Sequence, residues 1–355
     1  MSGTNAGISI HGAILAPSSR VEGPEQMTLV QEKPVTKTAS ITRIPTTDYA
    51  THPAYGKLFG KPAFPTRVAA LRRLLPVLWE QAARRYKNRH RFPPMIAPGQ
   101  STLTADIIRN GVVAVHATSE EMARIAAGAA PYVAALEARR AQIPVGQART
   151  WNDTSLPIGR DEAEQLYKDV RTALKRRGIL DAAETYVGHA IKIKNLDVQI
   201  NDPADAHWRD HFADARVPDP STAYMHIDSV RRVKCMIYLT DVTDRTGPFS
   251  YVLGTHTIRL GFLEDIVRKA NDISRLDRCD RDTRTLFSAL PKMLQKKSEF
   301  GNDLLDSMPE VAELLAAEHF FTSDQGNLIL FDNNAIHRGG RVLEGTRIIL
   351  QVPLR

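Results

Sequence analysis

The stretch Tyr224-Met225-His226-Ile227-Asp228 contains the residues around which the rest of the chain is organised. In a β-strand, side chains two positions apart point to the same face, so His226 and Asp228 can contact one ion. A second histidine, His337, could supply a third ligand from a neighbouring strand. Two histidines and one carboxylate on one face of a metal leave the opposite positions open, as a non-haem Fe(II) centre requires to bind a co-substrate and O2. The sequence therefore predicts a catalytic metal site formed by His226, Asp228 and His337.

Arg347 follows His337 by ten residues and opens the apolar run Arg347-Ile348-Ile349-Leu350-Gln351-Val352. Its planar guanidinium group can donate two parallel hydrogen bonds to a carboxylate. In a pocket of low dielectric constant, such an ion pair contributes more than one that is exposed to water. We therefore expect Arg347 to bind a carboxylate group. The alternative is an arginine at a strand end that forms a surface ion pair.

The order H-x-D, then H, then R resembles the Fe(II)/2-oxoglutarate-dependent dioxygenases, in particular their phytanoyl-CoA dioxygenase-like branch. The likeness extends from about residue 185 to the C-terminus. The run Gly247-Pro248-Phe249-Ser250-Tyr251-Val252-Leu253-Gly254-Thr255-His256 is similar to the family's G-P-x-x-x-x-P-G-S-H, with Leu253 where the family usually has proline. The run Gly326-Asn327-Leu328-Ile329-Leu330-Phe331-Asp332 is similar to the strand that leads to the distal histidine. H-x-D alone is a weak signal, but the four-part order with these flanks is specific.

The resemblance implies Fe(II), 2-oxoglutarate as co-substrate, and O2. The single carboxylate and the absence of a thiolate near the ligands also favour iron over zinc. The family reaction decarboxylates 2-oxoglutarate to succinate and CO2 and oxidises a small-molecule substrate. Halogenating relatives carry a small residue where this chain has Asp228, so hydroxylation or another oxidation, such as desaturation or ring formation, is preferred over halogenation. By the same resemblance Arg347 binds the far carboxylate and the Asn201 amide contacts the co-substrate, although Asn201 could instead form a turn before Asp202-Pro203.

The composition is that of a globular protein with 355 residues and 43% hydrophobic content, enough for a sizeable interior. The two cysteines, Cys235 and Cys279, are too few for a disulfide framework and favour a reducing, cytoplasmic setting. No run approaches the length of a membrane span, and the N-terminal residues show no basic patch followed by an apolar core, so we expect no membrane partner. The net charge of +7 is compatible with anionic partners, but solubility is the better explanation for it.

Two other functions compete with a small-molecule oxygenase. The first is a binding protein that keeps the metal-site fold without turnover. The second is an oxygenase that modifies nucleic acid, which the basic charge and the arginine-bearing helices would suit. No basic motif interleaved with aromatic residues supports it, so nucleic acid is disfavoured as a partner.

The predicted fold is mainly β with flanking helices: a double-stranded β-helix, or cupin-like jelly roll, with N-terminal helices and a helical insertion. Residues 1–65 are predicted to be a loosely ordered arm, 66–184 a helical elaboration, and 185–355 the catalytic core. The insertion at 257–317 could serve as a lid or as the surface of a homodimer.

The element positions follow from apolar periodicity and turn residues. Helices are predicted around residues 65–92, 103–110, 119–142 and 161–177. Strands are predicted at residues 111–115, 187–194, 196–201, 224–228, 233–239, 249–253, 319–322, 328–331 and 347–352. The identity of the substrate is not predicted.

Overall fold

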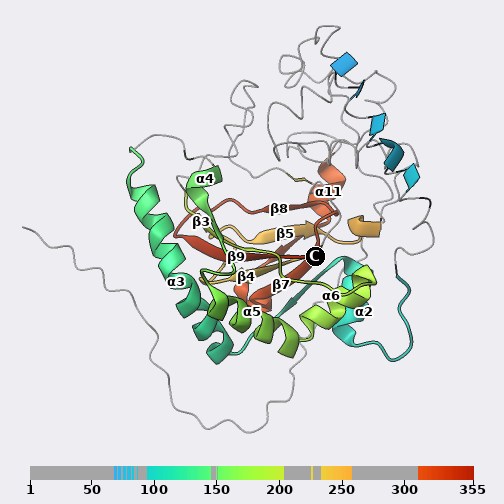
Figure 1. Ribbon diagram of the computed structural model, residues 1–355, viewed down its shortest axis with the longest axis horizontal. Coiled ribbons are helices and arrows are strands. Elements are labelled where there is room, and N and C mark those ends of the chain that lie inside the picture. The colour runs from blue at the N-terminus through green and yellow to red at the C-terminus, as the bar shows by residue number, and fades with distance from the viewer. Residues whose placement is uncertain are drawn as a thin grey trace, which may run out of the picture. The chain divides into compact units, whose positions relative to one another are not determined.

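Figure 1 shows the computed structural model of the protein, which describes residues 94–144, 149, 151–203, 225–226, 233–257 and 311–355, with scattered positions between 68 and 86. These residues belong to one unit that spans 37–355. The predicted N-terminal arm and most of the predicted insertion lie outside the described residues. The domain boundaries therefore remain predictions.

The described strands form two antiparallel sheets. The larger sheet has the order β1-β7-β4-β9-β3-β2, made of Val112–Val115, Leu328–Asp332, Val233–Tyr238, Arg347–Leu354, Leu196–Asn201 and Ser155–Ile158. The smaller sheet has the order β6-β5-β8, made of Glu318–Phe321, Phe249–Val252 and His337–Gly339. An isolated antiparallel bridge between His226 and His337 adds one more extended segment beside β8.

From β3 onward, successive extended segments alternate between the two sheets, except that β5 and β6 both lie in the small sheet. The chain passes from β3 in the large sheet to His226 in the small one, then to β4 in the large sheet and β5 in the small one. After β6 it returns through β7 to β8 and ends in β9, again changing sheet each time. This alternation is the winding of a jelly roll, so the predicted fold class is confirmed. Within the described residues the two sheets do not join into a closed barrel.

The two faces of the large sheet differ in chemistry, as the alternation along β3 illustrates. Leu196, Val198 and Ile200 are buried and pack into an apolar core with the helices. Gln199 and Asn201 are also buried but point to the opposite face, toward the space between the sheets. A strand with apolar side chains on one face and polar ones on the other buried face is typical of a fold that holds a site in its interior.

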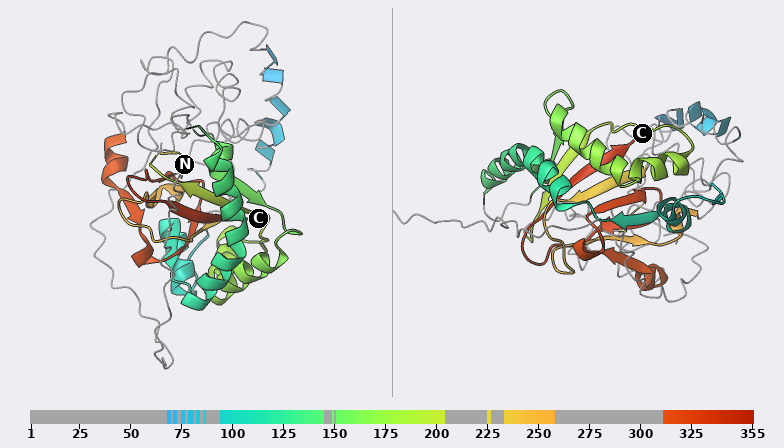
Figure 2. Two further views of the ribbon diagram at one scale, coloured as in Figure 1. Left: turned by 90° about the vertical axis from the view of Figure 1, so that its left-hand side faces the viewer. Right: turned by 90° about the horizontal axis from the view of Figure 1, so that it is seen from below.

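The helices α2 (Thr102–Asn110), α3 (Ser119–Ala141), α5 (Glu164–Arg176) and α6 (Ile179–Val187) lie along one side of the large sheet (Figures 1 and 2). In α5 the apolar side chains Leu166, Val170 and Leu174 recur every four residues and are fully buried. Burying each of them stabilises the fold by about 1.5–3 kcal/mol. The shorter helical elements are α4 (Trp151–Thr154), η2 (Thr255–Thr257), α11 (Ala312–Ala316) and η4 (Ser323–Gln325). None of the helices in the described ranges combines the length and apolar character that a membrane crossing needs.

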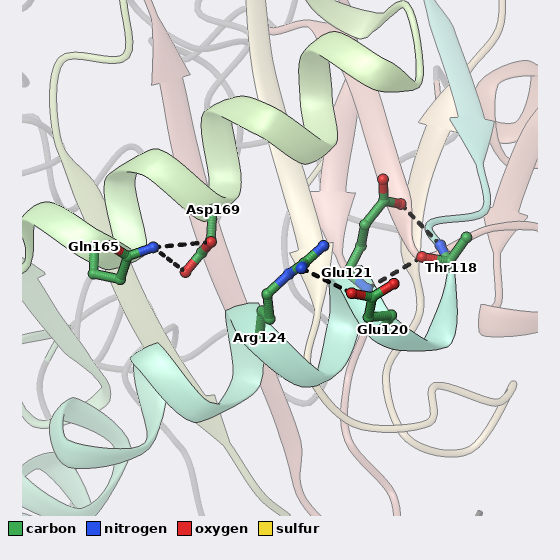
Figure 3. A network of polar contacts seen from close by, with 6 residues as sticks. All are labelled: Thr118, Glu120, Glu121, Arg124, Gln165 and Asp169. Carbon is green, nitrogen blue, oxygen red and sulfur yellow. Dashed lines mark hydrogen bonds and ion pairs between the residues drawn. The ribbon is translucent and has the colours of Figure 1, made fainter.

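The start of α3 is fixed by a reciprocal capping box (Figure 3). The Glu121 N–H donates to the Thr118 hydroxyl at 3.1 Å, and the Thr118 N–H donates to the Glu121 carboxyl at 2.9 Å. Arg177 Nε also donates to this carboxyl, at 2.9 Å. Burial alone would raise the pKa of Glu121, but the Thr118 and Arg177 hydrogen bonds and the attraction to Arg177 outweigh it and hold the pKa below its usual 4.5. The predicted helix start at residue 119 is confirmed.

The predictions around residues 179–194 were wrong in part. No helix was predicted directly after residue 178, but Ile179–Val187 forms α6, which ends at Gly188 with φ 76°. Of the strand predicted at 187–194, Val187 belongs to α6, and the residues after Gly188 carry one isolated bridge, between Ile193 and Leu354. Ile191 and Ile193 are buried while Lys192 is exposed, so the alternation was real. Pairing with only the last residues of β9 makes the segment too short to be a strand.

Candidate metal centre and co-substrate site

The structure places His226 directly beside His337. Their backbones exchange both hydrogen bonds of an antiparallel pair, with N···O distances of 2.9 Å from the His226 N–H and 3.0 Å from the His337 N–H. Directly opposed residues of such a pair project their side chains to the same face. The ring centroids are 4.5 Å apart, with the ring planes inclined by 54°. The two imidazole groups can therefore reach a common point.

The ring of His337 is held in a defined orientation. Its Nδ1 lies 2.8 Å from the carbonyl oxygen of Ala335, and the side chain is buried. Because a carbonyl oxygen only accepts hydrogen bonds, Nδ1 carries the proton of the neutral ring and Nε2 keeps its lone pair. The rings of Phe331, Phe249 and Tyr251 lie around it, with centroids at 5.3, 5.8 and 6.4 Å. This is the orientation and the tautomer that a metal-binding histidine needs.

The predicted carboxylate ligand, Asp228, lies outside the described residues. Within the described part of the chain, no three histidine, cysteine, aspartate or glutamate residues gather around one point. Two imidazole nitrogens fit Fe(II), which accepts nitrogen and oxygen ligands. Cys235 is buried in the core on the helix side of the large sheet, where burial raises the pKa of its thiol. It therefore supplies no thiolate to this site.

Arg347 and Asn201 meet in the interior. They are directly opposite in the pairing of β9 with β3, and Arg347 Nη2 donates to Asn201 Oδ1 at 2.9 Å. Arg347 Nη1 donates to the carbonyl oxygens of Gly247 and Gly340, the latter at 3.3 Å. The side chains of Arg347 and Asn201 are only 6% and 8% exposed, which argues against a surface ion pair for the first and a turn-forming role for the second.

Two glycines that the sequence analysis passed over allow the chain to approach this arginine. A Cβ at Gly339 would lie 3.2 Å from Arg347 Nη2, and one at Gly340 would lie 2.4 Å from the carbonyl oxygen of Pro248. Any side chain at Gly340 would push the segment after β8 away from the guanidinium group. The dipeptide Gly339-Gly340, two residues after His337, was a signal that could have indicated this close approach.

A buried tyrosine, also missed from the sequence, links the two sheets near Arg347. The hydroxyl of Tyr238 on β4 donates to the Phe321 carbonyl at 2.8 Å and accepts from the Phe249 N–H at 2.9 Å. Burial raises the pKa of Tyr238 to about 12, although its interaction with Arg347 opposes the shift. Nothing in the local pattern of β4 distinguishes this tyrosine from an ordinary core residue.

His256, which closes the Gly-Thr-His turn, is fully buried and contacts α2. Its Nε2 lies 2.9 Å from the carbonyl oxygen of Ile108 in α2. Gly111, the residue that ends α2, lies against the same ring, where an added Cβ would be 2.5 Å from His256 Nδ1. This histidine holds the loop after β5 against α2.

Comparison with known proteins identifies the family. Residues 107–345, well over half of the chain, match the family model described as phytanoyl-CoA dioxygenase (PhyH). No curated protein sequence matches the chain.

Among solved structures, the chain is similar to AviO1 from Streptomyces viridochromogenes Tue57, with 14% identity over 73% of this chain and 96% of that one and a TM-score of 0.41. It is also similar to EctD from S. alaskensis with 2-oxoglutarate and 5-hydroxyectoine, with 15% identity over 73% and 77% of the two chains and a TM-score of 0.43. The non-heme alpha ketoglutarate dependent epimerase SnoN from nogalamycin biosynthesis has 15% identity over 71% and 81%, with a TM-score of 0.40. On the strength of the family-model match, the chain belongs to the phytanoyl-CoA dioxygenase (PhyH) family, the branch of the Fe(II)/2-oxoglutarate-dependent dioxygenases that its sequence resembles.

Proposed function

We propose that this protein is an Fe(II)- and 2-oxoglutarate-dependent oxygenase that hydroxylates a small molecule and releases succinate and CO2. The observation that carries the proposal is the pairing of His226 with His337, whose rings are 4.5 Å apart on adjacent extended segments. The family match supports it.

His226, Asp228 and His337 would hold the iron in this proposal. When bound, Fe(II) together with 2-oxoglutarate and O2 supplies the oxidising power needed to break a C–H bond. The protein's contribution begins with His337, because the Ala335 carbonyl keeps its Nδ1 protonated and leaves Nε2 as the donor atom. His226 approaches from the neighbouring segment, so the two ligands are preset by backbone pairing and need little rearrangement.

Arg347 would bind the far carboxylate of 2-oxoglutarate. Its burial favours this role, because an ion pair with bidentate geometry gains strength when water is excluded. Asn201 and the carbonyl oxygens of Gly247 and Gly340 hold the guanidinium group in place. These three partners are uncharged, so their hydrogen bonds orient the guanidinium group without neutralising its positive charge.

Three aromatic side chains, Phe249, Tyr251 and Phe331, surround the ring of His337 and keep water away from it. A dry site strengthens the electrostatic interactions inside it. It also protects reactive intermediates from water, so that oxidation is directed to the bound substrate.

Anaerobic reconstitution with Fe(II) and 2-oxoglutarate tests the proposal. The expected result is a visible metal-to-ligand charge-transfer band, followed on exposure to air by succinate release that a substrate library accelerates. His337→Gln should abolish iron binding. His319→Gln, which replaces another histidine of the small sheet, should leave iron binding intact. A folded, iron-loaded protein that shows neither the band nor succinate would overturn the proposal.

A further inference from the structure

The turn that leads from β7 to His337 is organised by the side chain of Asp332. One carboxyl oxygen of Asp332 accepts the Asn334 N–H at 2.8 Å, and its backbone carbonyl accepts the Ala335 N–H at 3.3 Å. Ala335 in turn presents its own carbonyl to Nδ1 of His337 at 2.8 Å. The Asp332 carboxyl group is therefore two hydrogen bonds away from the histidine ring.

Asp332 is a charged residue type on the apolar face of β7. It is fully buried, and strand alternation puts its side chain on the helix-facing side of β7 together with Leu328 and Leu330. A buried carboxyl group on an apolar face lowers stability unless hydrogen bonds compensate for its lost hydration. The second carboxyl oxygen accepts a hydrogen bond from the hydroxyl of Tyr186 at 2.6 Å. An apolar residue at position 332 would satisfy the core more simply, so the aspartate must serve another requirement.

The rest of the turn is anchored independently of this carboxyl group. The Asp332 N–H donates to the Gly111 carbonyl at 2.8 Å. At the far end, the Ile336 N–H donates to the Thr255 hydroxyl at 3.0 Å, and the Val252 N–H donates to the Ile336 carbonyl at 2.9 Å. The Asp332 side chain fixes the middle of the turn, next to Ala335, through its hydrogen bond with the Asn334 N–H.

We propose that Tyr186 and Asp332 are positioning residues for His337. Tyr186 on α6 holds the Asp332 carboxyl group, which holds the turn, so that the Ala335 carbonyl fixes both the orientation and the tautomer of the His337 ring. The inference rests on the proposed function, because it gains its purpose from His337 being an iron ligand. It extends the site from the interior of the jelly roll to the helix layer on the outside of the large sheet.

A matched pair of tyrosine variants tests the inference. Tyr186→Phe removes the hydroxyl that binds Asp332. Tyr167→Phe removes an equally buried hydroxyl on α5, which donates to the Ile158 carbonyl at 2.8 Å and accepts the Leu196 N–H at 2.9 Å. Both variants lose buried hydrogen bonds between a helix and the large sheet, so both should lower thermal stability. Only Tyr186→Phe should change the tautomer of His337 and the affinity for Fe(II).

Two measurements separate positioning from stability. In metal-free protein with isotope-labelled histidine, two-bond proton–nitrogen spectra should show His337 as the Nδ1–H tautomer in the wild type and in Tyr167→Phe. In Tyr186→Phe they should show mixed tautomers, with the His337 signal assigned by its loss in His337→Gln. Anaerobic Fe(II) titration should show about tenfold weaker binding for Tyr186→Phe, at the lower end of the effect of outer-shell partners, and less than a twofold change for Tyr167→Phe.

Asp332 variants provide a second test. Asp332→Asn still accepts the Asn334 N–H and can donate to the Tyr186 oxygen, so it should retain Fe(II) affinity within about threefold. Asp332→Leu suits the apolar face but removes the acceptor of the buried Tyr186 hydroxyl and Asn334 N–H, so thermal stability should fall, as in Tyr167→Phe. Its Fe(II) affinity should fall at least tenfold, whereas that of Tyr167→Phe should not. If the wild type binds no Fe(II), the proposed function fails. If the wild type binds Fe(II) but Tyr186→Phe matches Tyr167→Phe in tautomer and affinity, the positioning role is overturned while the proposed function stands.

Discussion

Asn201→Asp is the substitution that most directly tests the proposed role of Arg347. The two side chains are almost fully buried and joined by a 2.9 Å hydrogen bond from Arg347 Nη2 to Asn201 Oδ1. Aspartate has nearly the same shape as asparagine, so the new carboxylate would accept the same hydrogen bond and form an ion pair with the guanidinium group. The fold should therefore be retained, while the charge that attracts the co-substrate is neutralised.

The expected loss of affinity follows from the repulsion between two carboxylates that share one guanidinium group. If they lie about 5 Å apart in a region with an effective dielectric constant of about 20, they repel by about 3 kcal/mol. This energy corresponds to a roughly 100-fold weaker binding of 2-oxoglutarate. Asn201→Ala adds no charge and removes one hydrogen bond to a charged group, so it should weaken binding by only about tenfold.

The assay is anaerobic titration of the iron-loaded protein with 2-oxoglutarate, followed through the charge-transfer band, with thermal unfolding as a check on the fold. The informative quantity is the ratio of the dissociation constants of Asn201→Asp and Asn201→Ala. If folded, iron-loaded Asn201→Asp binds 2-oxoglutarate within threefold of the wild type, Arg347 does not hold the co-substrate carboxylate.

Three further predictions concern the framework of the site. In thermal unfolding, Gly111→Ala should lower the free energy of unfolding by more than about 4 kcal/mol, because a Cβ at this residue, with φ 79°, would lie 2.4–2.6 Å from buried side chains. Gly188→Ala, with φ 76° and open space around the new Cβ, should lower it by only about 1 kcal/mol. Because the pKa of Glu121 is lowered, its ionised form contributes stability above pH 4.5, and this stability is lost as the pH falls through the folded-state pKa. Glu121→Gln should therefore lose less stability on acidification than the wild type, and an equal loss would contradict this reasoning. Arg338→Met breaks a buried ion pair with Glu318, whose N···O distances are 2.6 and 2.7 Å, and should lower the free energy of unfolding in urea by about 3–5 kcal/mol. Adding Glu318→Leu should recover most of this loss, because no unpaired charge then remains buried.

Much of the fold could be predicted from the sequence because its signals are local. The apolar alternation of residues 196–201 predicted β3, which the structure confirms at Leu196–Asn201. The acidic residues Glu120 and Glu121, which suit the first turn of a helix, predicted the start of α3 at Ser119. The prediction failed at residues 179–194, where the alternation of Ile191 and Ile193 was read as a complete strand, although it was a real feature of an extended segment. A local pattern reports which side chains are buried, but not how many residues of a partner strand are available for pairing.

The sequence by itself determined the residue types of the candidate site and their order along the chain, because chemistry and strand alternation are properties of short segments. Only the tertiary structure decided that His226 lies beside His337 and that Asn201 lies opposite Arg347, because those contacts arise from pairing between segments far apart in the chain. The same is true of the contact between Tyr186 and Asp332, which joins a helix to the end of a strand. No periodicity along the chain records such a contact, since it depends on how the helix layer packs against the large sheet.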